Sequence, residues 1–303
     1  QQQYGDDEYI YEIGSDKTED ILIDDLSVYF DEVGPYEPVE YTIEWCGISD
    51  CAGSATFDAR TFQFKNMQYI PAMSNVNVVF NEDENKIIST DAFYIDIYEV
   101  NEELYDNDGD DNHEATDYPP QSGISFDDAN DFCDSRTTNN QEHLEYEPSL
   151  TNFRLPTESE WYVAAAIQYD VLGNEVEQQY NYTTQIDNGT ITCAFGNILN
   201  CFSGALTVGY YNGDNLPDYQ KSTSPNGLYD CNANVREWVE KSTQFSHSNS
   251  GNVIMSGGFQ SSEVNAKNNY FTYEEEPNFQ GHATIGFRTV LTAPNPINGI
   301  SDE

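Results

Sequence analysis

Residues 153–161 read F-R-L-P-T-E-S-E-W, and this stretch predicts the start of a buried helix. The hydroxyl of Thr157 is placed to act as the N-cap. Glu160 follows three residues later, which is the spacing of a capping box. The apolar residues beyond it recur at the helical period. The side chains predicted to face the core are Trp161, Ala164 and Ala165.

Arginine is rare in the chain, with five among 303 residues, so each arginine is informative. Arg154 lies in the quoted stretch, and Arg288 ends a second short motif, G-F-R. We expect each to be held by buried carboxylates, which fix loops where regular structure is scarce. The alternative is that they clamp a substrate carboxylate. The candidate partners are Glu158, Glu160 and Glu237.

Two tryptophans and a second helix complete the predicted core. Trp161 and Trp238 are interpreted as core anchors rather than as binding platforms. A helix is predicted to begin at Ser125, because Ser125 can cap it and acidic residues follow in the first turn. The acidic residues are Asp127 and Asp128, and the inward-facing residues are Ala129, Phe132 and Cys133.

The first 62 residues show the two-residue alternation of β-strands. Val39, Tyr41, Ile43 and Trp45 alternate with polar residues. We expect these strands to extend the edge of the following domain or to pair with a neighbouring subunit, while packing within the chain itself is the simpler alternative. The predicted organisation is a β-rich extension (1–62), an α+β domain of short strands, helices and long loops (63–291), and an extended tail (292–303).

The formal charge is −43, from 54 acidic and 11 basic residues. Nucleic acids and anionic membrane surfaces require a basic footprint, so both classes of partner are excluded. The chain is nevertheless expected to fold, because 38% of its residues are hydrophobic and 14% are aromatic. No apolar run reaches the roughly 18 residues of a membrane span. High ionic strength, bound divalent cations or an oppositely charged partner would offset the self-repulsion.

Cysteine usage and the opening residues favour a secreted or cell-surface protein. The chain starts with three glutamines, as after removal of a signal peptide. Six cysteines favour the local bridges Cys46–Cys51 and Cys193–Cys201, which leaves Cys133 and Cys231 as a third pair; reduced thiols are the alternative. Two N-x-T sequons, at Asn181 and Asn188, are candidate glycan sites.

Further motifs follow the quoted stretch in a fixed order. They are S-P-N-G-L-Y-D at 224–230, N-V-R-E-W at 234–238, S-G-G-F at 256–259 and G-F-R at 286–288. With F-Y-I-D-I-Y-E-V-N at 93–101, they resemble the formylglycine-generating enzyme (sulfatase-modifying factor) domain over residues 63–291. The resemblance implies an irregular α+β domain similar to the C-type lectin-like fold.

The family's oxidase uses copper(I) held by two cysteine thiolates beyond the Gly-Gly pair. The resemblance places Ser262 and Lys267 at those positions, and no cysteine follows Cys231. Copper(I) prefers soft thiolates, so we expect neither copper nor oxidase activity. The related iron branch uses three histidines of an added helical domain, whereas this chain has four scattered ones: His113, His143, His247 and His282. The catalytic motifs of common hydrolases and nucleotide-binding enzymes are also missing.

Calcium is the ligand that the resemblance implies. A first site would use the side chains of Asp230 and Glu237 with the carbonyls of Ala233 and Val235. Hard oxygen ligands from a compact loop suit calcium. A second family site would begin at the pair Asn197 and Ile198.

A third candidate calcium site is the acidic loop D-N-D-G-D-D-N-H-E at 106–114. Asp106, Asp108 and Asp110 alternate like the first ligands of an EF-hand. However, Gly109 falls at the fourth position and Asp111 at the sixth, where the sharp turn requires glycine. A solvated acidic loop is therefore the favoured interpretation.

Three functional hypotheses follow. The first is a secreted, non-catalytic structural or adhesive surface protein that is stabilised by calcium and self-assembles into a fibre through its N-terminal β segment. The second is a glycan- or protein-binding module of C-type lectin-like type, with a variable region around Tyr270, Phe271 and Tyr273. The third is an enzyme with an unrecognised active site.

Overall fold

The computed structural model describes most of the chain after residue 65 and short segments before it. The chain separates into two compact units, Gln1–Gln63 and Phe64–Glu303, which are described separately below. The described residues are 2–4, 8–10, 38–46, 51–60, 66–80, 84–109, 117–141, 144, 152–169, 175–184, 186, 190–214, 219–245, 251–274 and 282–293.

The first unit contains two antiparallel hairpins. Strand β1 (Gln2–Tyr4) pairs with β2 (Glu8–Ile10), and β3 (Pro38–Cys46) pairs with β4 (Cys51–Arg60). The alternation that predicted a strand at Val39–Trp45 is confirmed. The register sets Tyr41 opposite Phe57 and Ile43 opposite Ala55, so the apolar residues of β3 and β4 share one face of the hairpin.

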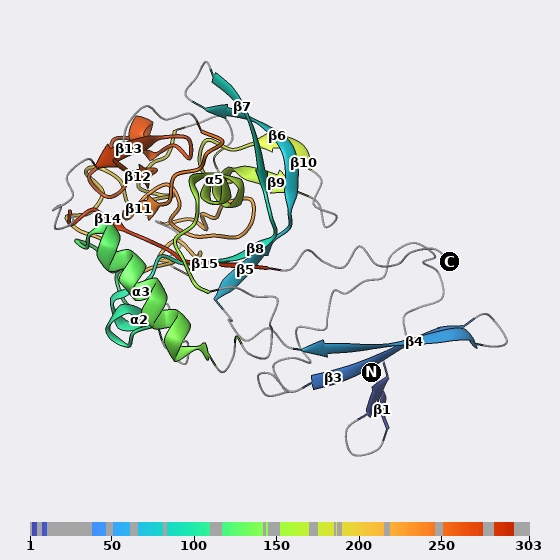
Figure 1. Ribbon diagram of the computed structural model, residues 1–303. Coiled ribbons are helices and arrows are strands. Elements are labelled where there is room, and N and C mark those ends of the chain that lie inside the picture. The colour runs from blue at the N-terminus through green and yellow to red at the C-terminus, as the bar shows by residue number, and fades with distance from the viewer. Residues whose placement is uncertain are drawn as a thin grey trace. The chain divides into compact units, whose positions relative to one another are not determined.

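The second unit contains two small sheets and two hairpins (Figure 1). One sheet has the order β15–β8–β5, from Val290–Thr292, Phe93–Asp96 and Met67–Ile70. The other has the order β13–β12–β11–β14, from Phe271–Glu274, Asn252–Met255, Arg236–Val239 and Ile285–Gly286. Its β11–β14 pair is parallel, which makes this sheet mixed. The hairpins are β6 (Met73–Phe80) with β7 (Glu84–Thr90) and β9 (Ile167–Tyr169) with β10 (Glu175–Gln179).

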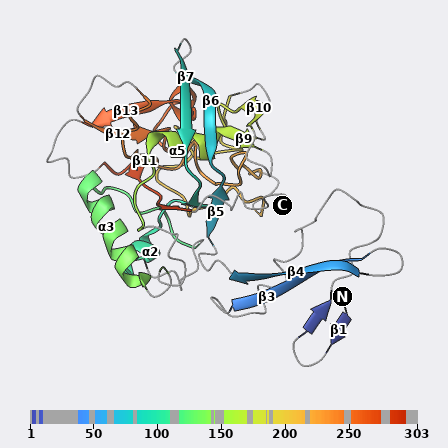
Figure 2. The ribbon, with the colours of Figure 1, turned by 45° about the vertical axis from the view of Figure 1, so that its right-hand side comes forward.

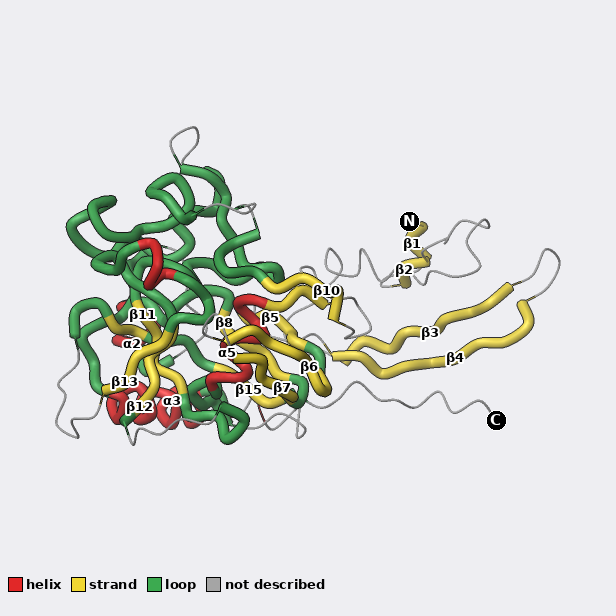
Figure 3. The backbone as a smooth tube through the Cα atoms, turned by 90° about the horizontal axis from the view of Figure 1, so that it is seen from above, coloured by secondary structure: helices red, strands yellow, loops and turns green. Residues whose placement is uncertain are grey.

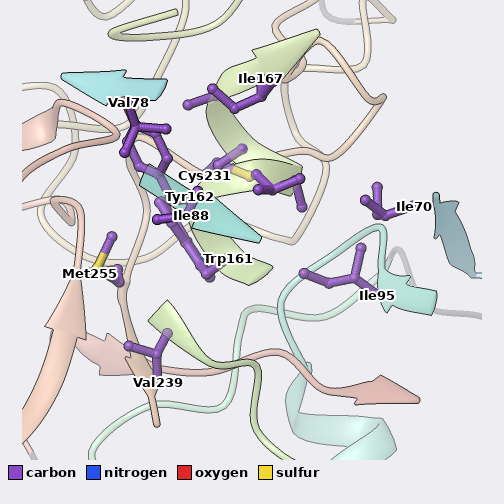
Figure 4. Close-up of a cluster of buried hydrophobic side chains, with 14 of the residues drawn as sticks. Ile70, Val78, Ile88, Ile95, Trp161, Tyr162, Ile167, Cys231, Val239 and Met255 are labelled. Atoms are coloured by element: carbon purple, nitrogen blue, oxygen red, sulfur yellow. The ribbon is translucent and has the colours of Figure 1, made fainter. Parts of the chain in front are cut away.

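Helix α5 (Glu158–Ala166) is the centre of the main core, and all nine of its residues are buried. The predicted capping box is confirmed: the Thr157 amide donates to Glu160 Oε2 at 2.8 Å, and the Glu160 amide donates to Thr157 Oγ1 at 3.3 Å. After its polar first turn the helix reads W-Y-V-A-A-A, which is apolar on every side, as expected for a helix inside a protein. Figure 4 shows Trp161 and Tyr162 of α5 among side chains of β6, β7, β11 and β12.

Two further helices, α2 (Glu102–Asp106) and α3 (Phe126–Asn139), lie together on one side of this unit in two views (Figures 1 and 2). The predicted cap of α3 is confirmed, because Ser125 forms a capping box with Asp128. Phe132 faces inward and stacks on Tyr105 of α2, with ring centroids 5.3 Å apart. The described residues also include the short 3₁₀ segment η1 (Glu263–Ala266), and Figure 3 shows that long loops make up much of this unit.

The disulfide predictions met different outcomes. The Cys193–Cys201 bridge is confirmed, with the Cα atoms 5.3 Å apart. The Cys133–Cys231 pairing is wrong, because both are free and buried. Cys231 belongs to the core around α5, whereas Cys133 faces inward from α3, and elimination among six cysteines carries no information about distance. The side chains of Cys46 and Cys51 lie outside the described part, although the backbone pairs the two residues.

Candidate functional site

A buried ion pair between Arg288 and Glu237 holds the motif-bearing segments together. Arg288 donates from Nε to Glu237 Oε2 and from Nη2 to Glu237 Oε1, each at 2.7 Å. The indole Nε1 of Trp161 donates to the same Oε2 at 2.7 Å. The remaining N–H groups of Arg288 bond to the backbone carbonyls of Asp96, Ile97 and Tyr229, so all five donors are used. Neither side chain is more than 1% exposed.

A second layer of buried carboxylates adjoins this pair. Glu99 accepts hydrogen bonds from Asn234 Nδ2 at 2.7 Å and from the Val235 amide at 3.0 Å. Asp230 accepts from the Gly209 amide at 2.7 Å. Asp230 and Asn234 both have positive φ angles, so these side-chain contacts hold the loop between them in an unfavourable backbone conformation.

Electrostatics in this layer are dominated by desolvation. Burial raises the pKa of Glu99 well above its usual value, and the nearby carboxylates of Asp230 and Glu237 raise it further. Burial also raises the pKa of Asp230 to about 6. Three carboxyl groups around one guanidinium leave an excess of buried negative charge, and protonation of one of them relieves it.

The first predicted calcium set is only partly suited to a cation. Both oxygens of Glu237 are occupied by Arg288 and Trp161, so Glu237 does not fit as a ligand in this arrangement. Ala233 and Val235 are buried beside it. In the part of the chain that the structure describes, no three His, Cys, Asp or Glu side chains come together as a metal-binding group.

The second predicted calcium segment has a feature that fits a cation. Asn197 is fully buried, and its Oδ1 atom has no hydrogen-bond partner. The Nδ2 group of Asn197 donates to the backbone carbonyl of Gly204 at 2.9 Å. The backbone carbonyl of Asn197 accepts from the backbone amide of Asn234 at 3.0 Å. Ile198 packs in a small buried cluster with Ala233. The fold therefore brings the two predicted calcium segments into contact. The Oδ1 atom of Asn197, which lacks a hydrogen-bond partner, is a hard oxygen ligand of the type calcium prefers.

The acidic loop after α2 is tied to α3 through its backbone. Asn139 Nδ2 donates to the Asp108 carbonyl at 3.0 Å, and Asn140 Nδ2 donates to the Gly109 carbonyl at 2.8 Å. The side chains of Asp106 and Asp108 are exposed, and Asp110 lies outside the described residues. Within the described part, this agrees with a solvated loop.

The two residues that the resemblance places at the family's thiolate positions flank η1. Ser262 precedes this helix and Lys267 follows it, and both side chains are half-buried. The segment packs tightly on the Gly-Gly motif, since a Cβ on Gly257 would lie 2.7 Å from the Asn265 carbonyl oxygen. Exposed apolar side chains lie nearby: Val264 is 59% exposed, and Leu199, 46% exposed, is joined to Ser261 by a backbone hydrogen bond.

The structure describes some of the tyrosines, sequon asparagines and histidines singled out from the sequence. Tyr270 and Phe271 are half-buried beyond η1, whereas the side chain of Tyr273 is outside the described part. Asn181 is exposed, and Asn188 is not among the described residues. His282 is exposed, and the three other histidines also fall outside the described residues.

The predicted arginine–carboxylate pairs are confirmed for Arg154 with Glu160, at 2.6 Å, and for Arg288 with Glu237, at 2.7 Å. Both tryptophans are 1% exposed, which confirms them as core anchors. Glu158 pairs with neither arginine. A third pair, Arg136 with Asp96 at 2.9 Å, was not predicted, although the scarcity of arginine makes Arg136 equally informative.

Comparison with known proteins agrees with this architecture. The family model described as the sulfatase-modifying factor enzyme 1-like domain matches residues 56–293. PvdO from Pseudomonas aeruginosa is similar in structure, with a TM-score of 0.52 and 14% identity over 75% of this chain and 94% of PvdO. Treponema denticola variable protein 1 is also similar, with a TM-score of 0.50 and 17% identity over 85% of this chain and all of that protein. No curated protein matches the chain. The predicted α+β, C-type lectin-like fold is confirmed.

We expect Arg288→Met to destabilise the protein severely, by about 3–5 kcal/mol, because it leaves Glu237 buried without a cation. The matched control is Arg154→Met, since the side chain of Arg154 is 29% exposed and water can solvate Glu160. We expect the control to cost about 1–2 kcal/mol. Urea denaturation of both variants measures the difference, and equal losses would contradict the central role of Arg288.

Proposed function

The chain belongs to the sulfatase-modifying factor enzyme 1-like family, and we propose that it is a non-catalytic member that acts as an adhesive or structural protein outside the cell. The proposal rests on the sequence resemblance, which places Ser262 and Lys267 where the family's oxidase has its two copper-binding thiolates, and on a scaffold that keeps the buried Arg288–Glu237 pair. A hydroxyl and an ammonium group are not ligands for copper(I). The confirmed motifs serve the fold: they supply the ion pairs, caps and buried tryptophans.

Two observations, the disulfide and the net charge, support an extracellular location. The Cys193–Cys201 bridge suits an oxidising compartment. The charge of −43 is tolerated best where salt or divalent cations screen it. No helix among the described residues is long and apolar enough to span a bilayer.

Copper(I) binding and peptide oxidation test whether the protein lacks the family's oxidase activity. We expect the wild-type protein to bind no copper(I) at this position and to leave a sulfatase-type cysteine peptide unoxidised when copper is added. The double variant Ser262→Cys/Lys267→Cys is expected to bind one equivalent, because it restores two thiolates, and Ser262→Cys alone is the control. Competition with a chromophoric copper(I) chelator and mass spectrometry of the peptide are the measurements. An aldehyde product from the wild-type protein would overturn the proposal.

The proposed mode of assembly uses the β3–β4 hairpin. An isolated two-stranded hairpin is marginally stable, and in the described residues β3 and β4 pair only with each other. The register gathers the apolar residues on one face, whereas Glu40 lies opposite Asp58 on the other face. An apolar face with unpaired strand edges is suited to association with a second copy.

We expect wild-type protein to form oligomers in millimolar calcium and high salt, and Ile43→Asp to remain monomeric because it places a charge on the apolar face. Thr42→Asp is the matched control, since it adds the same charge one residue away on the opposite face. Size-exclusion chromatography with light scattering measures the masses. A wild-type protein that stays monomeric in all these conditions would exclude self-assembly.

Calcium is proposed to bind at the buried Oδ1 of Asn197, where it would supply the missing hydrogen-bond or ligand partner and neutralise charge. We expect millimolar calcium to raise the melting temperature of the wild-type protein by several degrees and to have little effect on Asn197→Ala. The double variant Asp106→Asn/Asp108→Asn is the control for the acidic loop. A calcium response that survives Asn197→Ala but is lost in the loop variant would move the site to that loop.

A further inference from the structure

Six aromatic side chains gather on a part of the second unit that is built only from loops and turns. We call them the tyrosine cluster. Four rings contact one another around Tyr210, whose centroid lies 5.3 Å from that of Tyr219 and 6.1 Å from that of Phe202. A stacked pair, Tyr98 and Tyr229, has centroids 5.3 Å apart and planes inclined by 12°. The cluster consists of Tyr98, Phe202, Tyr210, Tyr211, Tyr219 and Tyr229.

Gly209 joins the two halves of the cluster. It has a positive φ of 66°, and a Cβ at this position would lie 2.5 Å from Cε1 of Tyr98, so a side chain would displace that ring. The Gly209 amide is held by the Asp230 carboxylate at 2.7 Å. Tyr210 and Tyr211 follow directly in sequence, so the backbone that carries them passes beside the Tyr98 ring.

The loop closed by the Cys193–Cys201 disulfide also holds the tyrosine cluster in place through hydrogen bonds. The Tyr211 hydroxyl donates to the Cys193 carbonyl at 3.2 Å, and Cys193 is bonded to Cys201. The Gln220 amide, next to Tyr219, donates to the Ala194 carbonyl at 2.8 Å. The rings are therefore held in place before any partner arrives, which lowers the entropy lost on binding.

Most of these rings keep part of their surface accessible to solvent. Tyr211 is 1% exposed, whereas the other five members are partly buried. A tyrosine of the core such as Tyr162 is only 3% exposed. Tyrosines that are rigid and partly exposed are typical of protein-binding surfaces, because they offer a large contact area at a low cost in conformational entropy.

The charges around the rings indicate the kind of partner. Asp214 is exposed. Burial raises the pKa of the Tyr229 hydroxyl, and the nearby charges of Asp230 and Asp214 raise this pKa further. The protein as a whole carries a formal net charge of −43, so an acidic or strongly anionic partner is repelled. Aromatic faces bordered by carboxylates attract guanidinium and ammonium groups.

We propose that the tyrosine cluster is a docking surface for a basic segment of a partner protein, whose arginine or lysine side chains lie on the exposed rings while Asp214 neutralises their charge. The proposal uses neither the residues of η1 nor those of the β3–β4 hairpin. It goes beyond the proposed function and does not depend on whether copper chemistry or self-assembly is present.

The test uses the full-length protein and the fluorescently labelled peptide acetyl-(Gly-Arg)4-amide, with acetyl-(Gly-Gln)4-amide as the uncharged control. Fluorescence anisotropy is measured in 0.5 M salt, where the screening length is about 4 Å and attraction to distant carboxylates is suppressed. We expect the arginine peptide to bind and the glutamine peptide not to bind.

Variants locate the interaction. Tyr210→Leu/Tyr229→Leu keeps apolar bulk but removes two aromatic faces, and we expect it to weaken binding about tenfold. Asp214→Asn changes an exposed side chain without touching the ring packing, and we expect a severalfold loss even if the leucine variant folds poorly. Tyr270→Leu removes a half-buried tyrosine near η1 and is expected to bind like the wild-type protein.

Several outcomes would overturn the proposal. Equal binding of the glutamine peptide, or of neutral oligosaccharides such as maltohexaose and chitohexaose, would show a surface that does not select positive charge. Unchanged binding by both cluster variants would mean that the general negative field holds the peptide. Loss of binding only in Tyr270→Leu would place the partner beside η1 instead.

Discussion

The bidentate ion pair between Arg288 and Glu237 is the interaction on which the rest of the second unit depends. Arg288 follows β14 in the chain, Glu237 lies in β11, and Trp161, which shares the same carboxylate, lies in α5. The guanidinium also bonds to carbonyls at the end of β8 and in the loop that holds Tyr229. One side chain thus connects segments that few regular hydrogen bonds join. Removal of one partner would leave a buried charge without compensation.

The distribution of charge follows from the same constraint. The chain is strongly acidic, yet Arg136 and Arg288 are fully buried, Arg154 is partly buried, and each of the three pairs with a carboxylate. Each guanidinium offers several donors in a fixed plane, so it can bond to side chains and to loop carbonyls together. The exposed carboxylates remain hydrated, where their repulsion is weak in salt. Burying its few arginines lets an acidic chain build an irregular core.

This construction separates the frame from the surfaces that it presents. The capping boxes and buried tryptophans belong to the packed frame of the second unit, whereas Val264 of η1 is exposed and most of the tyrosine cluster is partly accessible to solvent. Loops on a rigid frame change with little effect on stability. A scaffold of this kind can lose a metal site and keep its fold, which is the combination on which the proposed adhesive role rests.

Local sequence determined the features that depend on neighbours in the chain. The caps at Thr157 and Ser125, the β3 and β4 strands and the Cys193–Cys201 bridge require only short-range geometry, and the ordered motifs identified the family fold. Tertiary structure decided which distant groups meet. It left Cys133 and Cys231 apart, occupied both oxygens of Glu237, brought Asn197 to Asn234 and assembled the tyrosine cluster from separate loops. The physical reason is that long loops carry no periodicity from which the position of a side chain in space can be read.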